Sequence, residues 1–107
     1  MKIKKFKFKS NDNPTPVKFN SIGDSFTGEF RYFGENKRFK DVWYIIMEKE
    51  DTGYIISCPT DLKNKFKLLI KTNKIGSGDK LKIEYVEDRK TKYKNNKKIF
   101  DISKVIE

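Results

Sequence analysis

Histidine is absent from the chain, and this absence excludes several kinds of chemistry. Without it there is no Ser-His-Asp or Cys-His nucleophile pair, no histidine metal ligand and no imidazole that titrates near neutral pH. The carboxylates are scattered along the sequence, apart from Glu48, Glu50 and Asp51. We interpret these three as turn chemistry and solvated surface rather than a metal site. The sequence therefore predicts a protein that is not an enzyme and that has no metal or cofactor.

Cysteine and long apolar runs are also scarce. Cys58 is the one cysteine, which excludes an intrachain disulfide and a cysteine zinc cluster, and we expect it to be a small apolar residue in a strand. No segment approaches the roughly 20 apolar residues that span a bilayer, and no apolar stretch follows Met1 as in a signal peptide. We expect a cytoplasmic protein without membrane contact, and a single folded domain at this length of 107 residues.

Cations and aromatic rings are abundant and interleaved. The chain has 25 Lys and Arg against 15 Asp and Glu, a formal net charge of +10, and 14% of its residues are Phe, Trp or Tyr. Lysines attract a phosphate backbone, while aromatic faces stack on unpaired bases of any identity, so this combination is typical of single-stranded nucleic-acid binding. Two other readings stay open. Most Phe can build the core while Lys solubilises the surface, and the Lys and Asn bias can reflect an A·T-rich genome.

The N-terminal residues 1–18 are predicted to form a basic arm and linker ahead of a domain at residues 19–107. Phe6 and Phe8 alternate with lysines, as in an edge strand, and residues 10–16 are polar and interrupted by two prolines. The arm fits either an extra strand or a flexible basic tether. We favour the strand, because a tether has no use for Phe at alternate positions.

Alternation of apolar residues predicts the first three strands. In residues 25–33, Phe26, Gly28, Phe30 and Tyr32 share one face, and a glycine there indicates bending or close backbone approach. A polar, basic loop at residues 34–41 follows. The β-forming residues 42–48 and 54–58 then form a hairpin around a turn at 51–53.

One helix and two further strands complete the expected elements. Thr60 or Asp61 can cap the helix, whose apolar residues Leu62, Phe66, Leu69 and Ile70 trace a single stripe. We expect the helix to end at Gly76. Strands follow at residues 81–86 and 99–106. Such an order predicts a mainly β protein: a five-stranded OB-fold barrel with one α-helix between strands 3 and 4, plus the N-terminal arm or extra strand.

Four motifs give the chain a family resemblance over residues 19–107. They are Gly23-Asp24-x-Phe26-x-Gly28, Trp43-Tyr44, Gly78-Asp79-x-Leu81-x-Ile83-x-Tyr85, and Lys98-Ile99-Phe100-Asp101. With these motifs the chain resembles small phage-type single-stranded DNA-binding proteins with an OB fold. The resemblance implies sequence-tolerant coating of single-stranded DNA during replication, recombination or repair of a viral genome in the host cytoplasm. It also makes replication or recombination proteins candidate partners.

The resemblance also implies where nucleic acid binds. In that family, rings and cations on the second and third strands, and in the loops between strands 1 and 2 and strands 4 and 5, form the binding surface. To these positions we add Arg31 on the first strand. The predicted binding residues are Arg31, Lys37, Arg38, Phe39, Lys40, Trp43, Tyr44, Tyr54, Arg89, Lys90, Lys92, Tyr93, Lys94, Lys97 and Lys98.

Reasoning from the residues themselves supports some of these positions more than others. The run 89–98 contains no acid, and burying Tyr93 would take its two flanking lysines out of water, so we expect that ring to stack on a base. Phe39 fits either base stacking or packing over the barrel mouth. Trp43 and Tyr44 point to opposite faces of an all-apolar strand, so one face is core and the other is a ligand surface, a partner surface or covered by the arm.

Two alternative functions remain. An RNA-binding OB-type or cold-shock-like barrel shares the same stacking platform and differs mainly in contacts to the 2′-hydroxyl. A structural or protein-interaction module of a virus or plasmid would instead use the N-terminal arm to add a strand to a partner's sheet. Exposed strand edges and the second apolar face are compatible with a homodimer.

Overall fold

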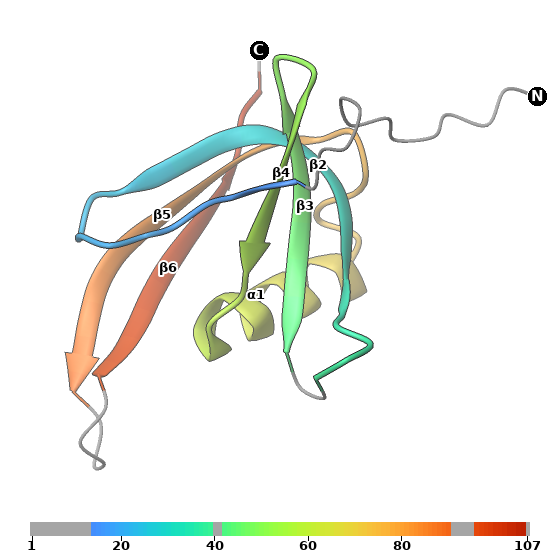
Figure 1. The fold of residues 1–107 in the computed structure, drawn as a ribbon. Helices are drawn as coiled ribbons and strands as arrows, with labels where there is room; N and C mark the ends of the chain where they lie inside the picture. Colours follow the sequence, from blue (N-terminus) through green and yellow to red (C-terminus); the bar gives the residue numbers. More distant parts are fainter. Residues whose placement is uncertain (1–13, 40–41, 91–95, 107) are drawn as a thin grey trace, which may run out of the picture.

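The computed structural model describes residues 14–39, 42–90 and 96–106, which form one sheet and one helix (Figure 1). In the part of the chain that it describes, no helix is long and apolar enough to cross a membrane. The elements are β1 (Thr15–Pro16), β2 (Ser25–Glu35), β3 (Trp43–Lys49), β4 (Thr52–Ser57), α1 (Thr60–Lys71), β5 (Lys80–Lys90) and β6 (Asn96–Lys104).

The sheet is mixed, with the hydrogen-bonded order β1-β4-β3-β2-β5-β6. Its pairings are antiparallel, except that the two-residue β1 runs parallel to β4. A mainly β protein with one helix is therefore confirmed. The predicted five-stranded OB-fold barrel is not confirmed, because the sheet does not close: β1 and β6 are the two ends of the order among the described strands. The helix follows the fourth strand rather than the third, since residues 15 and 16, expected in a linker, pair with β4.

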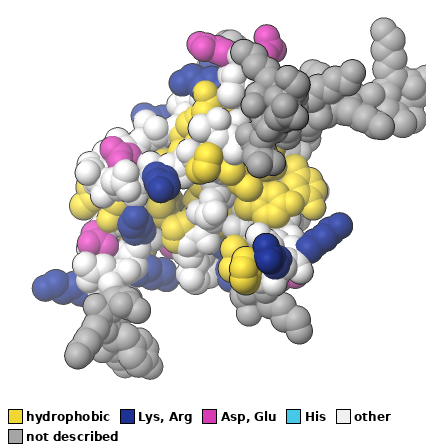
Figure 2. All heavy atoms as spheres, viewed as in Figure 1, with side chains coloured by type: hydrophobic (Ala, Val, Ile, Leu, Met, Phe, Trp, Pro, Cys, Tyr) yellow, Lys and Arg dark blue, Asp and Glu magenta, His cyan; other side chains and the backbone are white. Residues whose placement is uncertain are grey.

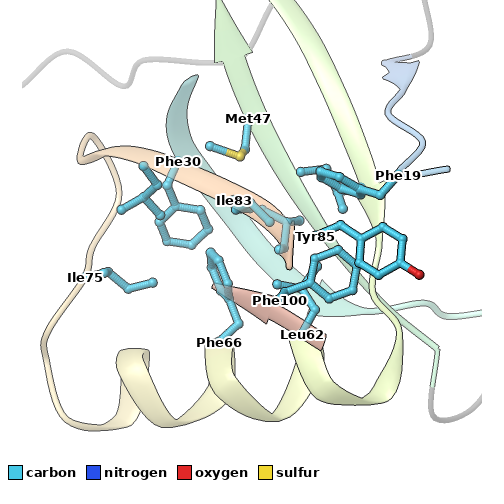
Figure 3. Packing of buried hydrophobic residues seen from close by; sticks show 12 residues of the cluster. Phe19, Phe30, Met47, Leu62, Phe66, Ile75, Ile83, Tyr85 and Phe100 are labelled. Carbon is cyan, nitrogen blue, oxygen red and sulfur yellow. The ribbon is translucent and has the colours of Figure 1, made fainter. Parts of the chain in front are cut away.

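The core lies between one face of the sheet and α1 (Figure 3). Alternate side chains of each strand point to the same face, and on this face they are apolar. Leu62 and Phe66 supply the helix side of the core. Phe66 packs on Phe30 with 5.1 Å between the ring centroids. The fully buried side chains are Ile45, Met47, Ile56, Leu62, Phe66, Leu81, Ile83 and Phe100.

The helix ends differ from the sequence prediction. The N-cap is Pro59, and no side chain of the described residues caps the first turn. Asp61 accepts a hydrogen bond from the Phe100 backbone N–H of β6 at 3.0 Å instead of capping its own helix. At the other end, α1 stops at Lys71, and Asn73 takes a left-handed φ of 57°. An asparagine in this conformation ends a helix as a glycine does, so the predicted end at Gly76 is wrong.

The hairpin turn between β3 and β4 also lies earlier than predicted. Glu50 and Asp51 both have positive φ, 51° and 62°, which is the geometry of a two-residue type I′ turn. Its twist matches that of the flanking strands, so pairing continues to Lys49 opposite Thr52. Glu50 and Asp51 are thus the two central residues of the turn, while Gly53 belongs to β4.

A short segment after β1 joins the two sides of the sheet. Within this bridging segment, residues 17–20, the Val17 N–H donates to the Ile55 carbonyl of β4 at 2.9 Å. The Phe19 ring is buried edge-on against Phe100 of β6, with 5.2 Å between centroids. Lys98 Nζ donates to the Phe19 carbonyl at 2.7 Å. The bridging segment therefore links β4 to β6, which do not pair directly with each other.

Candidate nucleic-acid interface

A β-bulge at Arg31 changes which side chains of β2 face outwards. The β2–β3 register shifts between Phe30, which is opposite Met47, and Tyr32, which is opposite Ile46. Phe30 is buried, whereas Tyr32 is 51% exposed on the outer face, away from α1. The prediction that Tyr32 shares a face with Phe26, Gly28 and Phe30 is therefore wrong, because the extra residue of a bulge reverses the alternation.

The Arg31 side chain forms ion pairs with two nearby glutamates. It is 12% exposed, and Nη2 lies 2.8 Å from a carboxylate oxygen of Glu48 and also pairs with Glu29. Glu29 and Glu48 are directly opposite each other in the β2–β3 ladder. Like charges in such a pair repel, so the guanidinium stabilises this part of the sheet. The structure thus places Arg31, a predicted binding residue, in an ion-pair cluster.

Exposed Tyr32 and half-buried Tyr44 form an aromatic pair beyond the bulge. The rings of Tyr32 and Tyr44 lie 5.8 Å apart at an angle of 44°, and we call this pair the tyrosine platform. Gly34 is opposite Tyr44 in the ladder. A Cβ atom at Gly34 would lie 2.6 Å from Cε2 and 2.7 Å from Cζ of Tyr32. The Tyr32 ring therefore occupies the space above Gly34.

The two hydroxyl groups of the tyrosine platform interact. Burial raises the pKa of Tyr44, and the neighbouring Tyr32, through its charge and a side-chain hydrogen bond, raises this pKa further. Both effects favour the neutral phenol of Tyr44 at physiological pH. The platform is thus a pair of rings that lie against each other, a surface suited to stacking.

The β2–β3 connection carries exposed cations next to the platform. Asn36 Oδ1 accepts hydrogen bonds from the backbone N–H groups of Arg38 at 2.8 Å and Phe39 at 3.3 Å. The Asn36 N–H in turn donates to the Val42 carbonyl at 2.7 Å. This turn leaves Lys37 and Arg38 exposed and Phe39 58% exposed, so Phe39 does not pack over the core. Lys40 lies outside the described residues.

Trp43 and Tyr54 are on the core side of the sheet. Trp43 stacks on Phe33 with 4.9 Å between centroids, and Lys67 of α1 places its ammonium group 4.2 Å from the indole centroid. Tyr54 packs on Phe26 at 4.9 Å. Both rings are half-buried. Of the two neighbours whose roles alternation left open, Tyr44 therefore faces outwards and Trp43 packs towards the helix.

The second predicted basic loop is largely a hairpin. Strand β5 continues to Lys90 and β6 begins at Asn96, because the pairs Arg89–Lys97 and Lys90–Asn96 extend the ladder. The prediction that Arg89, Lys90, Lys97 and Lys98 lie in a loop is wrong for this reason. Lys92, Tyr93 and Lys94 lie outside the described residues.

The cations of this hairpin differ in their surroundings. Lys98 donates to the bridging segment and lies 5.3 Å from the Tyr85 ring centroid, so it is engaged inside the fold. Arg89 pairs with Glu87 at 2.9 Å, although its side chain is 61% exposed. Lys90 is exposed and Lys97 is half-buried. In Figure 1, the ends of β5 and β6 and the β2–β3 connection lie at the same end of the molecule.

Charge and apolar surface are unevenly spread over the outer face. Figure 2 shows hydrophobic side chains over β2 and β3, with Lys and Arg side chains beside them at the end of the molecule where these strands are connected. Glu50 and Asp51 lie at the opposite end of β3, in the turn to β4. A polyanion bound to this face would therefore contact Lys and Arg side chains at the end where β2 and β3 are connected, not at the acidic turn.

Sequence reasoning missed Tyr32 and Gly34 as members of this surface. One signal was present: Tyr32 and Phe33 are adjacent rings, and strict alternation cannot bury both on one face. Such a doublet indicates a bulge or a two-sided strand. The structure brings Tyr32 and Tyr44 together near the end of the β2–β3 ladder that leads into the turn with Lys37, Arg38 and Phe39, whereas it holds Arg31 and Lys98 in contacts within the fold.

No family model, curated protein or solved structure was found to match the chain. The functional argument therefore depends on the chemistry of the described side chains. Those side chains offer two adjacent tyrosine rings for stacking, an exposed phenylalanine and two cations in an ordered turn. They can hold a ligand with flat faces and negative charge.

Proposed function

We propose that the protein binds single-stranded DNA with little sequence preference, through the tyrosine platform and the turn at residues 37–39. The observation that carries this proposal is the half-exposed Tyr32 ring beside Tyr44, in the ladder that leads into the turn with exposed Lys37 and Arg38. Bases of every identity present a π-face to such rings, and cations beside them neutralise the backbone. The resemblance to small phage-type single-stranded DNA-binding proteins supports the same ligand.

The platform favours unpaired over paired strands. In a duplex, each base face is covered by its neighbours, so a ring gains access only where stacking is broken. Cations alone would bind duplex and single strands alike. A preference for single strands is therefore the contribution of Tyr32 and Tyr44, while salt dependence is the contribution of Lys37 and Arg38.

The order of the elements is consistent with an OB-type architecture in an open form. The five long strands follow the order β4-β3-β2-β5-β6, and α1 lies between β4 and β5 in the chain. OB folds are five-stranded, partly open barrels that bind oligonucleotides on one sheet face and its flanking loops. In this proposal the bridging segment takes the place of direct pairing between β4 and β6, and the protein coats viral single-stranded DNA in the host cytoplasm during replication or recombination.

Fluorescence anisotropy with three labelled ligands tests the proposed function. Oligo(dT), oligo(rU) of the same length and a DNA duplex are titrated at two salt concentrations. We expect oligo(dT) to bind more tightly than the duplex and the affinity to fall with salt, with a log–log slope of about 0.7 per neutralised phosphate. Equal affinity for oligo(dT) and duplex, or an affinity that does not change with salt, would contradict the proposal. Tighter binding of oligo(rU) would indicate the RNA-binding alternative.

A further inference from the structure

We propose that Gly34 is a positioning residue, because the absence of a side chain at this place in β2 lets the Tyr32 ring lie over its own strand and beside Tyr44. The effect of Gly34 on ligand binding rests on the proposed function. The effect on the ring does not, and it can be measured without a ligand. The claim concerns how the tyrosine platform is built rather than what it binds.

The conformation of Gly34 does not itself explain a glycine. Gly23 and Gly78 have φ angles of 102° and 99°, a region that other residues rarely adopt. Gly34 is outside that region and is paired with Tyr44 within an antiparallel ladder, one pair before the ladder ends. Glycine weakens a strand interior, where it commonly marks a close approach of another group. Here the approaching group is the Tyr32 ring, which lies within 2.7 Å of where a Cβ would be.

The atoms in the way are at the far end of a side chain, and this decides what a substitution does. The nearest atoms to a Cβ at Gly34 all belong to the phenol end of Tyr32. A methyl group would therefore push the ring away rather than move the backbone of β2. The ring would lose its contact with Tyr44 across the ladder, and the fold would remain.

The consequence for binding is a loss of pre-organisation. Tyr32 and Tyr44 are held 5.8 Å apart in the free protein, so a ligand need not order them. A displaced Tyr32 ring would no longer offer its face beside Tyr44. Gly34 thus acts on a ligand only through Tyr32.

A double-mutant cycle tests this dependence, with oligo(dT) as the ligand. The proteins are the parent, Gly34→Ala, Tyr32→Ala and the double variant, and the control is Gly76→Ala, where a Cβ would meet nothing within 4 Å. We expect Tyr32→Ala to weaken binding roughly 5- to 150-fold, the range for loss of one base-stacking ring. Gly34→Ala should weaken it to a similar extent, and the double variant should be no weaker than the single ones. Gly76→Ala should bind like the parent.

Two outcomes of the cycle would overturn the inference. One is that Gly34→Ala binds like the parent while Tyr32→Ala is weakened. The other is that the losses multiply in the double variant, because Gly34 would then act independently of the ring. A Tyr32→Ala protein that binds like the parent counts against the proposed function, and the position of the ring is then decided by the measurement below.

Nuclear Overhauser effects report the ring position without any ligand. In the parent we expect effects from the Tyr32 ring protons to the Gly34 α-protons and to the Tyr44 ring protons. The Tyr32–Tyr44 effect should persist in Gly76→Ala and disappear in Gly34→Ala. Its retention in Gly34→Ala would refute the positioning role. If Gly34→Ala does not fold, the parent protein alone still tests the positioning role. Absence of the nuclear Overhauser effect between the Tyr32 ring protons and the Gly34 α-protons in the parent would also refute that role.

Discussion

At the scale of single residues, Arg31 and Arg38 show that a cation near an aromatic strand can have either of two roles. Arg31 occupies the bulge and pairs with Glu48 and Glu29. Arg38 is exposed in the turn that Asn36 organises through the Arg38 N–H. The first guanidinium offsets repulsion inside the sheet, whereas the second faces solvent beside the tyrosine platform.

Replacing each arginine by glutamine should therefore change a different property: the stability of the fold for Arg31 and the binding of oligo(dT) for Arg38. Arg31→Gln should lower the free energy of unfolding by about 1–3 kcal/mol, because Glu48 keeps its half-buried carboxylate without the guanidinium. Arg38→Gln should leave stability unchanged but lower the salt slope of oligo(dT) binding by about 0.7, the value for one phosphate contact on a single strand. Urea denaturation and anisotropy titrations measure the two quantities.

Lys71→Gln supplies the matched control for charge. Lys71 is an exposed cation at the end of α1, and its replacement changes the net charge by the same amount as Arg38→Gln. We expect the salt slope of this control to equal that of the parent. If Lys71→Gln and Arg38→Gln lower the slope equally, binding responds to net charge alone and the turn at residues 37–39 is not the site.

Single residues also limited what could be predicted from the sequence. Alternation grouped Ile45 and Met47 with Trp43 on one face of their strand, but it did not decide whether that face or the face of Tyr44 is the buried one. It failed at Tyr32, since one extra residue at Arg31 reverses every later side chain of the strand. A bulge is fixed by the partner strand and by local ion pairs, which a single strand's pattern does not contain.

At the scale of elements, α1 is fastened to β6 through Asp61. Its carboxylate accepts the Phe100 N–H at 3.0 Å and lies 3.0 Å from Lys65 Nζ. Burial alone would raise the pKa of Asp61, but these hydrogen bonds and the lysine charge outweigh it and hold the pKa below its ordinary value of 3.8. The ionised carboxylate is therefore the form that stabilises the contact between helix and strand.

The lowered pKa of Asp61 predicts a pH dependence of stability. A carboxyl group whose pKa is depressed by folding stabilises the protein above its unfolded pKa, and this contribution is lost as the pH falls through the folded pKa. The urea midpoint of the parent should thus fall as the pH drops below 3.8, and Asp61→Asn should fall less steeply over the same range. Urea denaturation at a series of acidic pH values measures this.

Asp101→Asn is the control for this acid titration. Asp101 is an exposed carboxylate on β6, so its removal should leave the acid slope close to that of the parent. Asp61→Asn with an unchanged slope would show that other carboxylates account for the acid sensitivity. The helix would then be held to β6 by its other contacts, such as the hydrogen bond that Lys65 Nζ donates to the Phe100 carbonyl.

The boundaries of the elements were less predictable than their existence. The five long strands and the helix were all expected, because apolar alternation and the stripe of Leu62 and Phe66 define them. The ends were missed where tertiary contacts decide them. Asp61 bonds to β6 instead of capping α1, and the pairing of Arg89 with Lys97 turns an expected loop into strand.

At the scale of the whole molecule, the sheet remains open and the bridging segment connects its two sides. Residues 17–20 reach β4 through Val17 and β6 through Phe19. This role was not predicted, because residues 10–16 are polar and contain two prolines, a pattern that indicates a linker. The predicted arm at residues 1–9 lies outside the described residues, so its role as a strand or a tether stays a prediction.

The contacts of the bridging segment predict that the stability of the fold depends on the Phe19 ring. Phe19 is 7% exposed and packs on Phe100, so Phe19→Ala removes a buried ring from the core cluster. Such a change typically costs about 3–5 kcal/mol of unfolding free energy. Ile22→Ala is the matched control, because Ile22 follows closely in the chain but is 61% exposed, and it should shift the free energy by no more than about 0.5 kcal/mol. Urea denaturation of both variants measures the difference, and similar small shifts in the two would show that β4 and β6 are held in place without the bridging segment.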